Sequence, residues 1–505
     1  MQVVVVGDLA WEGRYHLGDE AMSEVVLDQL RARGDTVTCI AGDPEITQRF
    51  YGVAAVPRLG FRGLSRTEQE RLLDDLVSAA AGRAADPCGT RRTLDALRAA
   101  DAVVIAGGGN LNSIGIHHVF ERVAVKRIAE QLGVPLYVTS QTVGPHLRDA
   151  ERALVAEIAR YARVFGVRER SSAALMRGLC GNDARIIQTL DDALLLEPGP
   201  VSVDLPTAGR YAVASFTFHA KTTALHADDY YRELAAILDQ LSAQLDVDVL
   251  LLPHMSTFEV PNALGVEDDV YGHTRIVDFS RSGRLRAVPL LPARALLSVT
   301  ANAEFSVSTR YHPLIFGAAL GVPALGIVTS YYSAIRMRGA LANVGMEDFA
   351  IPFEHWRSSF APDLIEALRT RLPEFREHLR AAGTAGREHQ QRWWDELSAS
   401  MHEGRSVAYA DVAAPTPVHW GDSRMQESLA LARGAQELTH LDRLNALMDD
   451  EQQRQHNCDT DFRLERLEEE LAHLRRTVAE VRHRQRPPGA GLRDAVRRKI
   501  ASGRT

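Results

Sequence analysis

The stretch SVSTRYHPLIFGAALGVP, residues 306–323, decides the fold. Its first residues continue an apolar run that ends at Ser308, and Pro313 then introduces the apolar segment LIFGAAL. This pattern predicts a buried strand, a short turn and a helix that starts at Pro313 and ends at Gly321. A strand, a turn and a helix in this order form the repeating unit of an open α/β sheet.

Two side chains on this turn, Arg310 and His312, carry useful chemistry. We expect them at the carboxyl end of the strand and beside the positive end of the helix, where open α/β sheets bind anions. Arg310 offers a rigid fork of donors to a carboxylate or phosphate, and His312 can exchange a proton near neutral pH. The structural alternative is a surface ion pair for Arg310 and a helix cap for His312.

Composition limits the class of protein. A chain of 505 residues with 45% hydrophobic residues has room for two or three domains with real cores. The net charge of -8 and the pI near 6.2 argue against nucleic acid as the main partner. Without CxxC or other metal-ligand spacing, the cysteines predict free thiols in a reducing cytoplasm and no metal site; they are Cys39, Cys88, Cys180 and Cys458.

The N-terminal sequence MQVVVVGDLAWEG lacks a basic start and has an apolar core of only four residues, so it predicts a first strand and no secretion signal. No apolar run approaches eighteen residues, and we expect no membrane-spanning helix. Together with the cysteines, this predicts a cytoplasmic protein.

Short buried strands alternate with helical patterns through the first 200 residues. The strands are predicted at residues 3–6, 36–41, 102–106, 135–140, 164–167 and 185–188. Two of them end in glycine-containing turns, GDLAWEGRYHLGDEA and GGGN. This alternation predicts a doubly wound parallel sheet, that is, a Rossmann-like domain at residues 1–200.

The alternation restarts after the Pro- and Gly-containing segment LEPGPVSVDLPTAGR, which is typical of a domain linker. Strands are predicted at residues 211–218, 247–252 and 303–307, and a helical stretch from residue 362 to about 400 completes the pattern. We therefore predict a second Rossmann-like domain at residues 201–400 that faces the first across a cleft, followed by a linker at residues 401–429.

The C-terminal part has another character. Apolar residues at spacings of three and four predict three heptads of coiled coil within a helical segment at residues 430–486; they are Leu464, Leu467, Leu471, Leu474, Val478 and Val481. Exposed leucines at both core positions favour a homodimer. Residues 487–505 form a basic tail, which is either a solvated end or a peripheral contact with an anionic membrane.

Several strand ends converge on the predicted cleft with residues able to bind a ligand. They are Gly18, Asp19, Glu20, Gly108, Gly109, Asn110, Gln141, Arg168, His254, Arg310 and His312. Each has a structural alternative. Asp19 could cap a helix, the glycines could serve only tight turns, and His254 could be an interior histidine with satisfied hydrogen bonds.

The ordered motifs GDEA, GGGN, SQTVGP, GVRERSS, TLDDALLL, LLPH and STRYHPLIFGAALGVP resemble the polysaccharide pyruvyl transferases over about residues 1–350. The resemblance implies two domains similar to the GT-B glycosyltransferases. It also implies transfer of a pyruvyl group from phosphoenolpyruvate to sugar hydroxyls of a polysaccharide or glycan precursor, usually as a cyclic ketal, without a cofactor or metal. The acceptor could be carried on a lipid.

The same resemblance implies that Arg168, Arg310 and His312 hold or activate phosphoenolpyruvate. Two separated guanidinium groups suit a donor with both a carboxylate and a phosphate. Ketal formation also needs an acid, for which His312 is the first candidate, and a base, for which Asp19 and Glu20 are weaker candidates.

Two positions depart from the family pattern. His16 stands where the family usually has Asn, two residues before the Gly-Asp pair, which leaves the acceptor open. Arg336 stands nine residues before Gly345 where many members have Lys; it keeps the charge and changes the geometry. Two other functions stay open, a GT-B glycosyltransferase that uses a nucleotide sugar and a noncatalytic assembly subunit built on the coiled coil.

Overall fold

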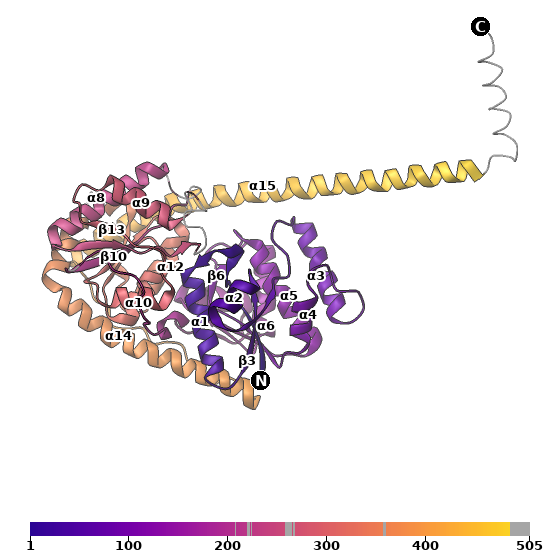
Figure 1. Ribbon diagram of the computed structural model, residues 1–505, viewed down its shortest axis with the longest axis horizontal. Coiled ribbons are helices and arrows are strands. Elements are labelled where there is room, and N and C mark those ends of the chain that lie inside the picture. The colour runs from indigo at the N-terminus through magenta and orange to yellow at the C-terminus, as the bar shows by residue number, and fades with distance from the viewer. Residues whose placement is uncertain are drawn as a thin grey trace, which may run out of the picture. The chain divides into compact units, whose positions relative to one another are not determined.

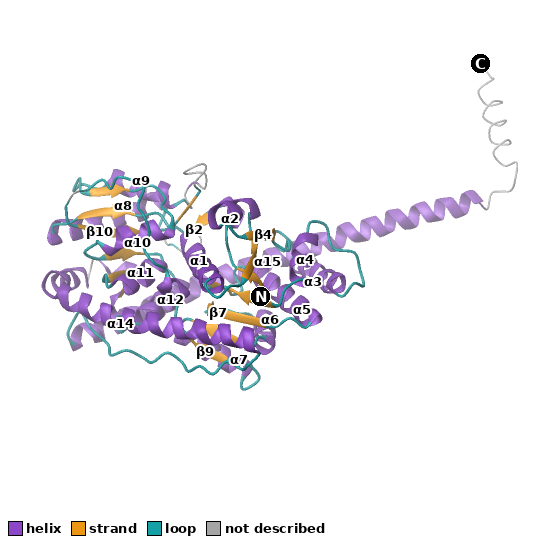
Figure 2. Ribbon diagram, turned by 60° about the horizontal axis from the view of Figure 1, so that its bottom comes forward, coloured by secondary structure: helices purple, strands orange, loops and turns teal. Residues whose placement is uncertain are grey.

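The first sheet of the computed structural model is built from short β-branched segments whose two faces are both buried. Strand β1 spans Gln2–Val6. The side chains of Val4 and Val6 belong to the apolar cluster on one face of the sheet, whereas those of Val3 and Val5 belong to the cluster on the other face. A strand buried on both sides needs helices on both sides, which is the doubly wound arrangement. Figure 2 shows these strands between layers of helices.

The structure describes residues 1–207, 209–219, 223, 225–257, 265, 268–356 and 360–484, and at residues 12, 451 and 455–484 only the backbone. The chain divides into two compact units. The first comprises Met1–Leu64 and Glu68–Met448, and the second comprises Ser65–Thr67 and Asp449–Thr505. The basic tail predicted at residues 487–505 lies outside the described residues.

All pairs in the first sheet are parallel, in the order β4-β3-β1-β5-β7-β8-β9 with β6 beside β7. Its other strands are β3 (Thr36–Ala41), β4 (Ala54–Pro57), β5 (Ala102–Ile105), β6 (Gly108–Leu111), β7 (Leu136–Val143), β8 (Val164–Val167) and β9 (Ile186–Gln188). The helices between them are α1 (Leu17–Arg31), α2 (Pro44–Tyr51), α3 (Arg66–Ala80), α4 (Arg91–Arg98), α5 (Ile116–Leu132), α6 (Asp149–Tyr161) and α7 (Arg170–Cys180).

The second sheet is also parallel, in the order β13-β11-β10-β14-β15-β16. Its strands are β10 (Tyr211–Ser215), β11 (Asp248–Leu251), β13 (Leu285–Ala287), β14 (Ser306–Ser308), β15 (Ala324–Val328) and β16 (Ala350–Pro352). Its helices are α8 (Ala227–Leu245), α9 (Asp269–Phe279), α10 (Ala293–Ala301), α11 (His312–Leu320), α12 (Tyr331–Ala342) and α13 (Phe353–His355). The predicted pair of doubly wound domains is confirmed.

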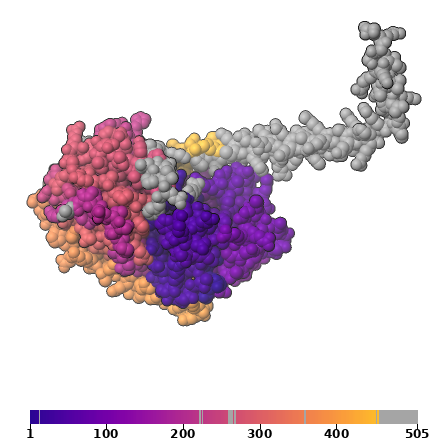
Figure 3. All heavy atoms as spheres, in the orientation of Figure 1, coloured from indigo at the N-terminus to yellow at the C-terminus, as the bar shows by residue number. Residues whose placement is uncertain are grey.

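A short antiparallel pair, β2 (Tyr15–His16) with β12 (Met255–Ser256), joins the two domains. His16 pairs with Met255, and the Leu17 amide donates to the His254 carbonyl at 2.8 Å. Figure 3 shows the first half of the chain in indigo and purple against the second half in magenta and red. The start of α1 is therefore fixed against the second domain.

The helix α14, Ala361–Glu403, departs from the predicted boundaries. Its first part belongs to the core of the second domain, and its last part, with Trp393 and Trp394, belongs to the core on one face of the first sheet. Figure 1 shows it in orange, running from the second domain to the first. The helix that we expected to complete the second domain therefore serves both.

The segment predicted as a linker and coil is also partly built into the first unit. Val412 and Val418 donate backbone hydrogen bonds to Gln188 and Gly345, and α15, Ser423–Arg484, starts by burying Leu429. The heptads fall within α15, but their side chains lie outside the described residues, so the coiled coil and the dimer stay predictions. Within the described ranges, every helix is too short or too polar to cross a lipid bilayer.

Candidate functional site

Two adjoining cavities lie where the first and second domains meet. Cavity A has a volume of about 270 Å³, and cavity B about 260 Å³. Cavity A is lined by His16, Gly18, Thr217, His219, His254, Met255, Thr309, Arg310, Tyr311, His312, Thr329, Ser330, Tyr332, Ser333, Arg336 and Met337. Cavity B is lined by Asp8, Trp11, Arg14, His16, Asp19, Gly109, Asn110, His118, Met255, Tyr332 and Arg336.

Three helices begin at cavity A. Gly18 lies in the first turn of α1, His312 is the first residue of α11, and Ser330 is the N-cap of α12, where it accepts from the Ser333 amide. Each helix start carries a partial positive charge and unpaired amide donors. With Arg310 and Arg336 on its wall, cavity A is strongly suited to an anion.

Several polar atoms around cavity A are buried and have no hydrogen-bond partner within the described part of the chain. They are Thr217 Oγ1, His254 Nε2, Arg310 Nε, Tyr311 OH, His312 Nε2 and Arg336 Nε. A buried polar atom left unpaired costs about 1–3 kcal/mol. Such a concentration of unsatisfied groups in one cavity indicates a polar ligand.

Arg310 is held from both domains. Its Nη2 donates to Asp269 Oδ1 at 2.5 Å, and its Nη1 donates to His16 Nε2 at 3.3 Å. Burial acts to raise the pKa of Asp269, but the charge of Arg310, the neighbouring His273 and the hydrogen bonds from Arg310 and the His254 amide together hold that pKa below its usual value. Arg310 is thus a fixed cation with its Nε still unpaired.

His312 packs directly on the start of α1. A Cβ placed on Gly18 would lie 1.8 Å from His312 Nδ1, so only glycine fits there. Burial, and then the charges of Arg168 and Arg336, lower the pKa of His312 well below its ordinary value. The lowered pKa leaves the imidazole neutral near pH 7.

Arg336 is held by aromatic rings. Its guanidinium carbon lies 4.7 Å from the Tyr311 ring centroid and 4.6 Å from that of Tyr332. A flat guanidinium stacks on such rings better than the ammonium of a lysine does, so the two rings suit an arginine at this position. Arg336 lines both cavities.

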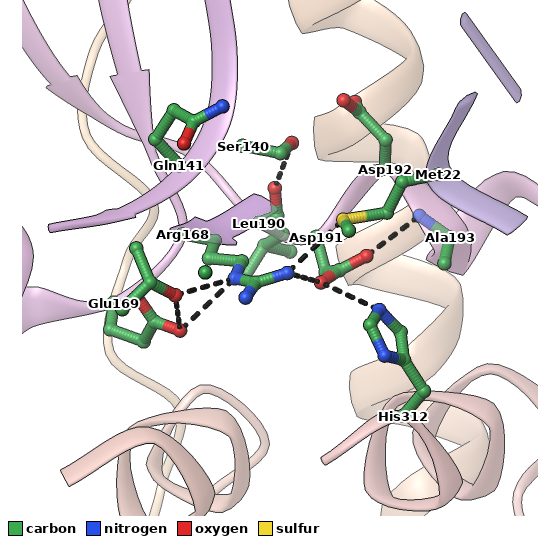
Figure 4. A network of polar contacts seen from close by, with 12 residues as sticks. Met22, Ser140, Gln141, Arg168, Glu169, Leu190, Asp191, Asp192, Ala193 and His312 are labelled. Carbon is green, nitrogen blue, oxygen red and sulfur yellow. Dashed lines mark hydrogen bonds and ion pairs between the residues drawn. The ribbon is translucent and has the colours of Figure 1, made fainter. Parts of the chain in front are cut away.

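Arg168, predicted to hold the ligand, lines neither cavity A nor cavity B. It is fully buried and donates to Thr142 Oγ1 at 2.8 Å and to Asp191 Oδ2 at 2.7 Å. Figure 4 shows Asp191 between Arg168 and His312. The Nε2 atom of His312 lies 3.7 Å from Asp191 Oδ2. Arg168 thus lies next to residues of cavity A: it contacts Asp191, which faces His312, and its guanidinium carbon lies 4.4 Å from the centroid of the Tyr311 ring.

Three other predicted residues also lie apart from both cavities. Gln141 is buried in β7 and donates to the Ala106 carbonyl, while Gly108 is enclosed in β6. Glu20 accepts from the Ala10 amide at 2.7 Å and from Tyr51 OH, so its carboxylate points away from the cleft. The Gln141 amide nitrogen and Glu20 thus pair within the first domain, whereas Gln141 Oε1 is buried without a hydrogen-bond partner in the part of the chain that the structure describes.

The remaining predicted residues line the two cavities. Gly18, His254, Arg310, His312 and Arg336 line cavity A, and Asp19, Gly109, Asn110 and Arg336 line cavity B. His254 Nδ1 lies 2.7 Å from Ser215 Oγ, which leaves its Nε2 facing the cavity wall without a partner. Cavity B is closed on one side by Asp8, which accepts from Arg122 at 2.9 Å.

Sequence reasoning missed several lining residues. Tyr311 lies between Arg310 and His312, and Asp8 lies two residues after the first strand, so both carried a positional signal. No such sequence signal marked Tyr332, His219 or Thr217, because only tertiary packing brings these side chains to the wall of cavity A. In the described part of the chain, no cluster of three or more His, Cys, Asp or Glu side chains is arranged to hold a metal ion.

Solved structures with the same fold include sugar-nucleotide enzymes. A protein described as a UDP-N-acetylglucosamine 2-epimerase from Listeria monocytogenes superposes with a TM-score of 0.52 at 10% identity, over 82% of this chain and 99% of that one. The UDP-GlcNAc 2-epimerase from Neisseria meningitidis gives 0.49 at 12% identity, over 79% and 100%. The calicheamicin glycosyltransferase CalG4 gives 0.44 at 14% identity, over 80% and 99%.

The likeness to the Listeria protein shows the fold alone, two Rossmann-like domains in the GT-B arrangement. Comparison with curated protein sequences gave no significant match. The family model for polysaccharide pyruvyl transferase, in contrast, matches residues 16–331. This range starts at His16 and includes Arg310 and His312 of cavity A as well as Asp19 of cavity B. The chain is a member of the polysaccharide pyruvyl transferase family and, as such, a transferase.

Proposed function

We propose that this protein transfers a pyruvyl group from phosphoenolpyruvate to hydroxyls of a sugar in a polysaccharide or glycan precursor and forms a cyclic ketal. The observation that carries the proposal is the set of buried, unpaired polar atoms in cavity A, two of them on Arg310 and Arg336. Phosphoenolpyruvate has a carboxylate and a phosphate, and it matches two guanidinium groups and the helix starts around them.

His312 is the proposed acid. Its pKa is lowered by burial and by neighbouring arginines, and a bound dianion would offset those positive charges and raise that pKa. The imidazolium then delivers its proton to the methylene carbon of the donor as the adjacent carbon becomes electrophilic. Because His312 takes up a proton when the donor binds, we expect donor affinity to rise as the pH falls toward neutrality.

The proposed donor can be tested by thermal shift and by phosphate release. We expect phosphoenolpyruvate to stabilise the protein and to release phosphate in the presence of methyl glycosides of glucose, galactose or mannose. Arg310→Ala should weaken phosphoenolpyruvate binding about 10- to 100-fold, since hydrogen bonds to charged groups contribute about 1.5–3 kcal/mol. The control is Arg369→Ala, an exposed arginine of α14 that pairs with Glu366.

A nucleotide-sugar donor is the alternative that the fold leaves open, because epimerases and glycosyltransferases share it. Stabilisation by UDP together with no response to phosphoenolpyruvate would contradict the proposal.

We further propose that the reaction takes place in the cytoplasm, on a precursor that could be carried by a lipid. The scattered cysteines support a reducing compartment. Contact of the basic tail with an anionic membrane is part of this proposal, and co-sedimentation of the full-length protein with vesicles containing an anionic phospholipid would test it.

A further inference from the structure

His16 lies on the wall that cavities A and B share. Its backbone is fixed by the β2–β12 pair and precedes α1 as the N-cap residue, but its side chain makes no capping hydrogen bond. The imidazole is 34% exposed and faces the cleft, so capping does not explain why a histidine stands here.

The hydrogen bonds of His16 define its neutral tautomer. Nδ1 lies 2.6 Å from Asp19 Oδ2, and Nε2 lies 3.3 Å from Nη1 of Arg310. A guanidinium only donates and an ionised carboxylate only accepts, so Nδ1 carries the proton and Nε2 carries the lone pair. A carboxylate behind one ring nitrogen and a lone pair on the other is the arrangement of a histidine base.

We propose that His16 takes the proton from the acceptor hydroxyl, held in position by Asp19, and that the acceptor sugar occupies cavity B. The inference rests on the proposed pyruvyl transfer. Cavity B suits a sugar because carboxylate, amide and aromatic side chains line it, among them Asp19, Asn110 and Trp11. The sugar would then meet the donor at the shared wall, where His16 is placed.

The proton count supports a base at this position. One sugar oxygen bonds to the central carbon of phosphoenolpyruvate while the methylene carbon gains a proton, and a second sugar oxygen then displaces phosphate from the same carbon. The two hydroxyl protons that are lost balance the proton gained by the methyl carbon and the one gained by the leaving phosphate. His16 Nε2 accepts a hydroxyl proton as the carbon–oxygen bond forms.

Donor binding also frees His16 for this step. A phosphate competes with Nε2 for the Arg310 guanidinium and is the stronger acceptor. Charged or titratable groups surround His16 from four elements: Asp19 of α1, Arg310 before α11, His312 of α11, and His219 after β10. A dianion in cavity A therefore changes the charge around His16 before the acceptor reacts.

The test compares His16→Asn with the wild-type full-length protein. Asparagine keeps a side chain that can hydrogen-bond, but its amide does not take up a proton near neutral pH. We expect kcat in phosphate release to fall about 10²-fold or more, with loss of the acidic limb of its pH profile. Phosphoenolpyruvate affinity should stay within about threefold, because partly exposed polar contacts contribute little.

Two further variants separate positioning from a general structural effect. Asp19→Asn should lower kcat less than His16→Asn and leave donor affinity unchanged. His402→Asn breaks another histidine–carboxylate pair, 3.1 Å from Asp35 and outside both cavities, and should leave kcat unchanged. Equal kcat and pH profile in His16→Asn and wild type would overturn the inference, as would a loss of donor binding that accounts for the loss of turnover.

A spectroscopic measurement needs no acceptor. In protein labelled with 15N-histidine, the signals lost in His16→Asn should show a protonated Nδ1 and an unprotonated Nε2 at pH 8. The reverse tautomer would overturn the assignment of His16 as the base. Failure of the wild-type protein to bind phosphoenolpyruvate is a separate result, which would overturn the proposed function and, with it, this inference.

Discussion

At the scale of single residues, two glycines have identities that depend on residues of the other domain. A Cβ on Gly18 would lie 1.8 Å from His312 Nδ1, and a Cβ on Gly109 would lie 2.6 Å from Tyr332 OH. From the sequence, both were candidates for ligand binding, and tight turns were the structural alternative. The physical reason for glycine at both positions is the close approach of side chains from the second domain to the backbone of the first.

Gly18→Ala should therefore impair the site more than the fold. The new methyl group displaces the His312 ring, and a displacement of about 1 Å in a reacting group costs on the order of 10²-fold in rate. We expect a fall of this size in kcat/KM for phosphoenolpyruvate, measured by phosphate release. Gly178→Ala is the control, because a Cβ on this helical glycine of α7 would have nothing within 4 Å, and the variant should keep full activity.

Glu20 gives a prediction about pH and stability. Burial raises the pKa of this carboxyl from 4.5 to about 8, despite the hydrogen bonds from Tyr51 and Ala10. The folded state therefore binds this proton more tightly than the unfolded state, and the free energy of unfolding falls as the pH rises from about 4.5 to about 8. Each pH unit within this window contributes up to about 1.4 kcal/mol.

Glu20→Gln should remove this contribution. Urea unfolding of both proteins between pH 5 and pH 8.5 would show a smaller fall in the free energy of unfolding for the variant. If the free energy of unfolding fell equally with pH in the wild type and in Glu20→Gln, the pH dependence would not come from Glu20.

At the scale of elements, α14 is the largest departure from the predicted organisation. Its 43 residues correspond to about 65 Å of helix, which exceeds the size of one domain. Trp393 Nε1 donates to Thr139 Oγ1 at 3.0 Å, and Trp394 Nε1 donates to Asp192 Oδ1 at 2.8 Å, so the end of α14 is anchored in the first domain. The helix-forming sequence predicted the helix but did not indicate which core receives each end.

Trp393→Ala should lower stability without changing the site. Removing a fully buried tryptophan costs about 3–5 kcal/mol. We expect a lower midpoint in chemical unfolding and an unchanged KM for phosphoenolpyruvate, since Trp393 packs on one face of the first sheet and lines neither cavity. An unchanged unfolding midpoint would show that the end of α14 contributes little to the first domain.

At the scale of the whole molecule, the C-terminal segment was predicted to begin at residue 430. In the structure the first compact unit extends to Met448, and the second unit continues from Asp449. Before this point α15 packs on the second domain: Arg433 donates to the carbonyls of Glu347 at 2.7 Å and Ala350 at 2.8 Å, and Leu444 and Met448 are buried. A deletion from residue 430 would expose this surface, whereas a deletion after Met448 leaves it intact.

Truncation after Met448 should yield a folded monomer that still binds phosphoenolpyruvate. The heptads between residues 464 and 481 would be removed, and with them the expected dimer contact. Light scattering of full-length and truncated protein measures this directly. Equal numbers of chains per particle would contradict dimerisation through the heptads.

The sequence by itself determined the alternating strands and helices, the two parallel sheets, and the placement of Arg310 and His312 between the end of a strand and the start of a helix. These features depend on hydrophobic periodicity and turn residues, which act over short distances along the chain. Only the tertiary structure decided that Arg168 is enclosed, that Arg336 is stacked at the cavities, and that His16 stands between them. The reason is that side chains far apart in sequence share a cavity only when packing across two domains brings them together.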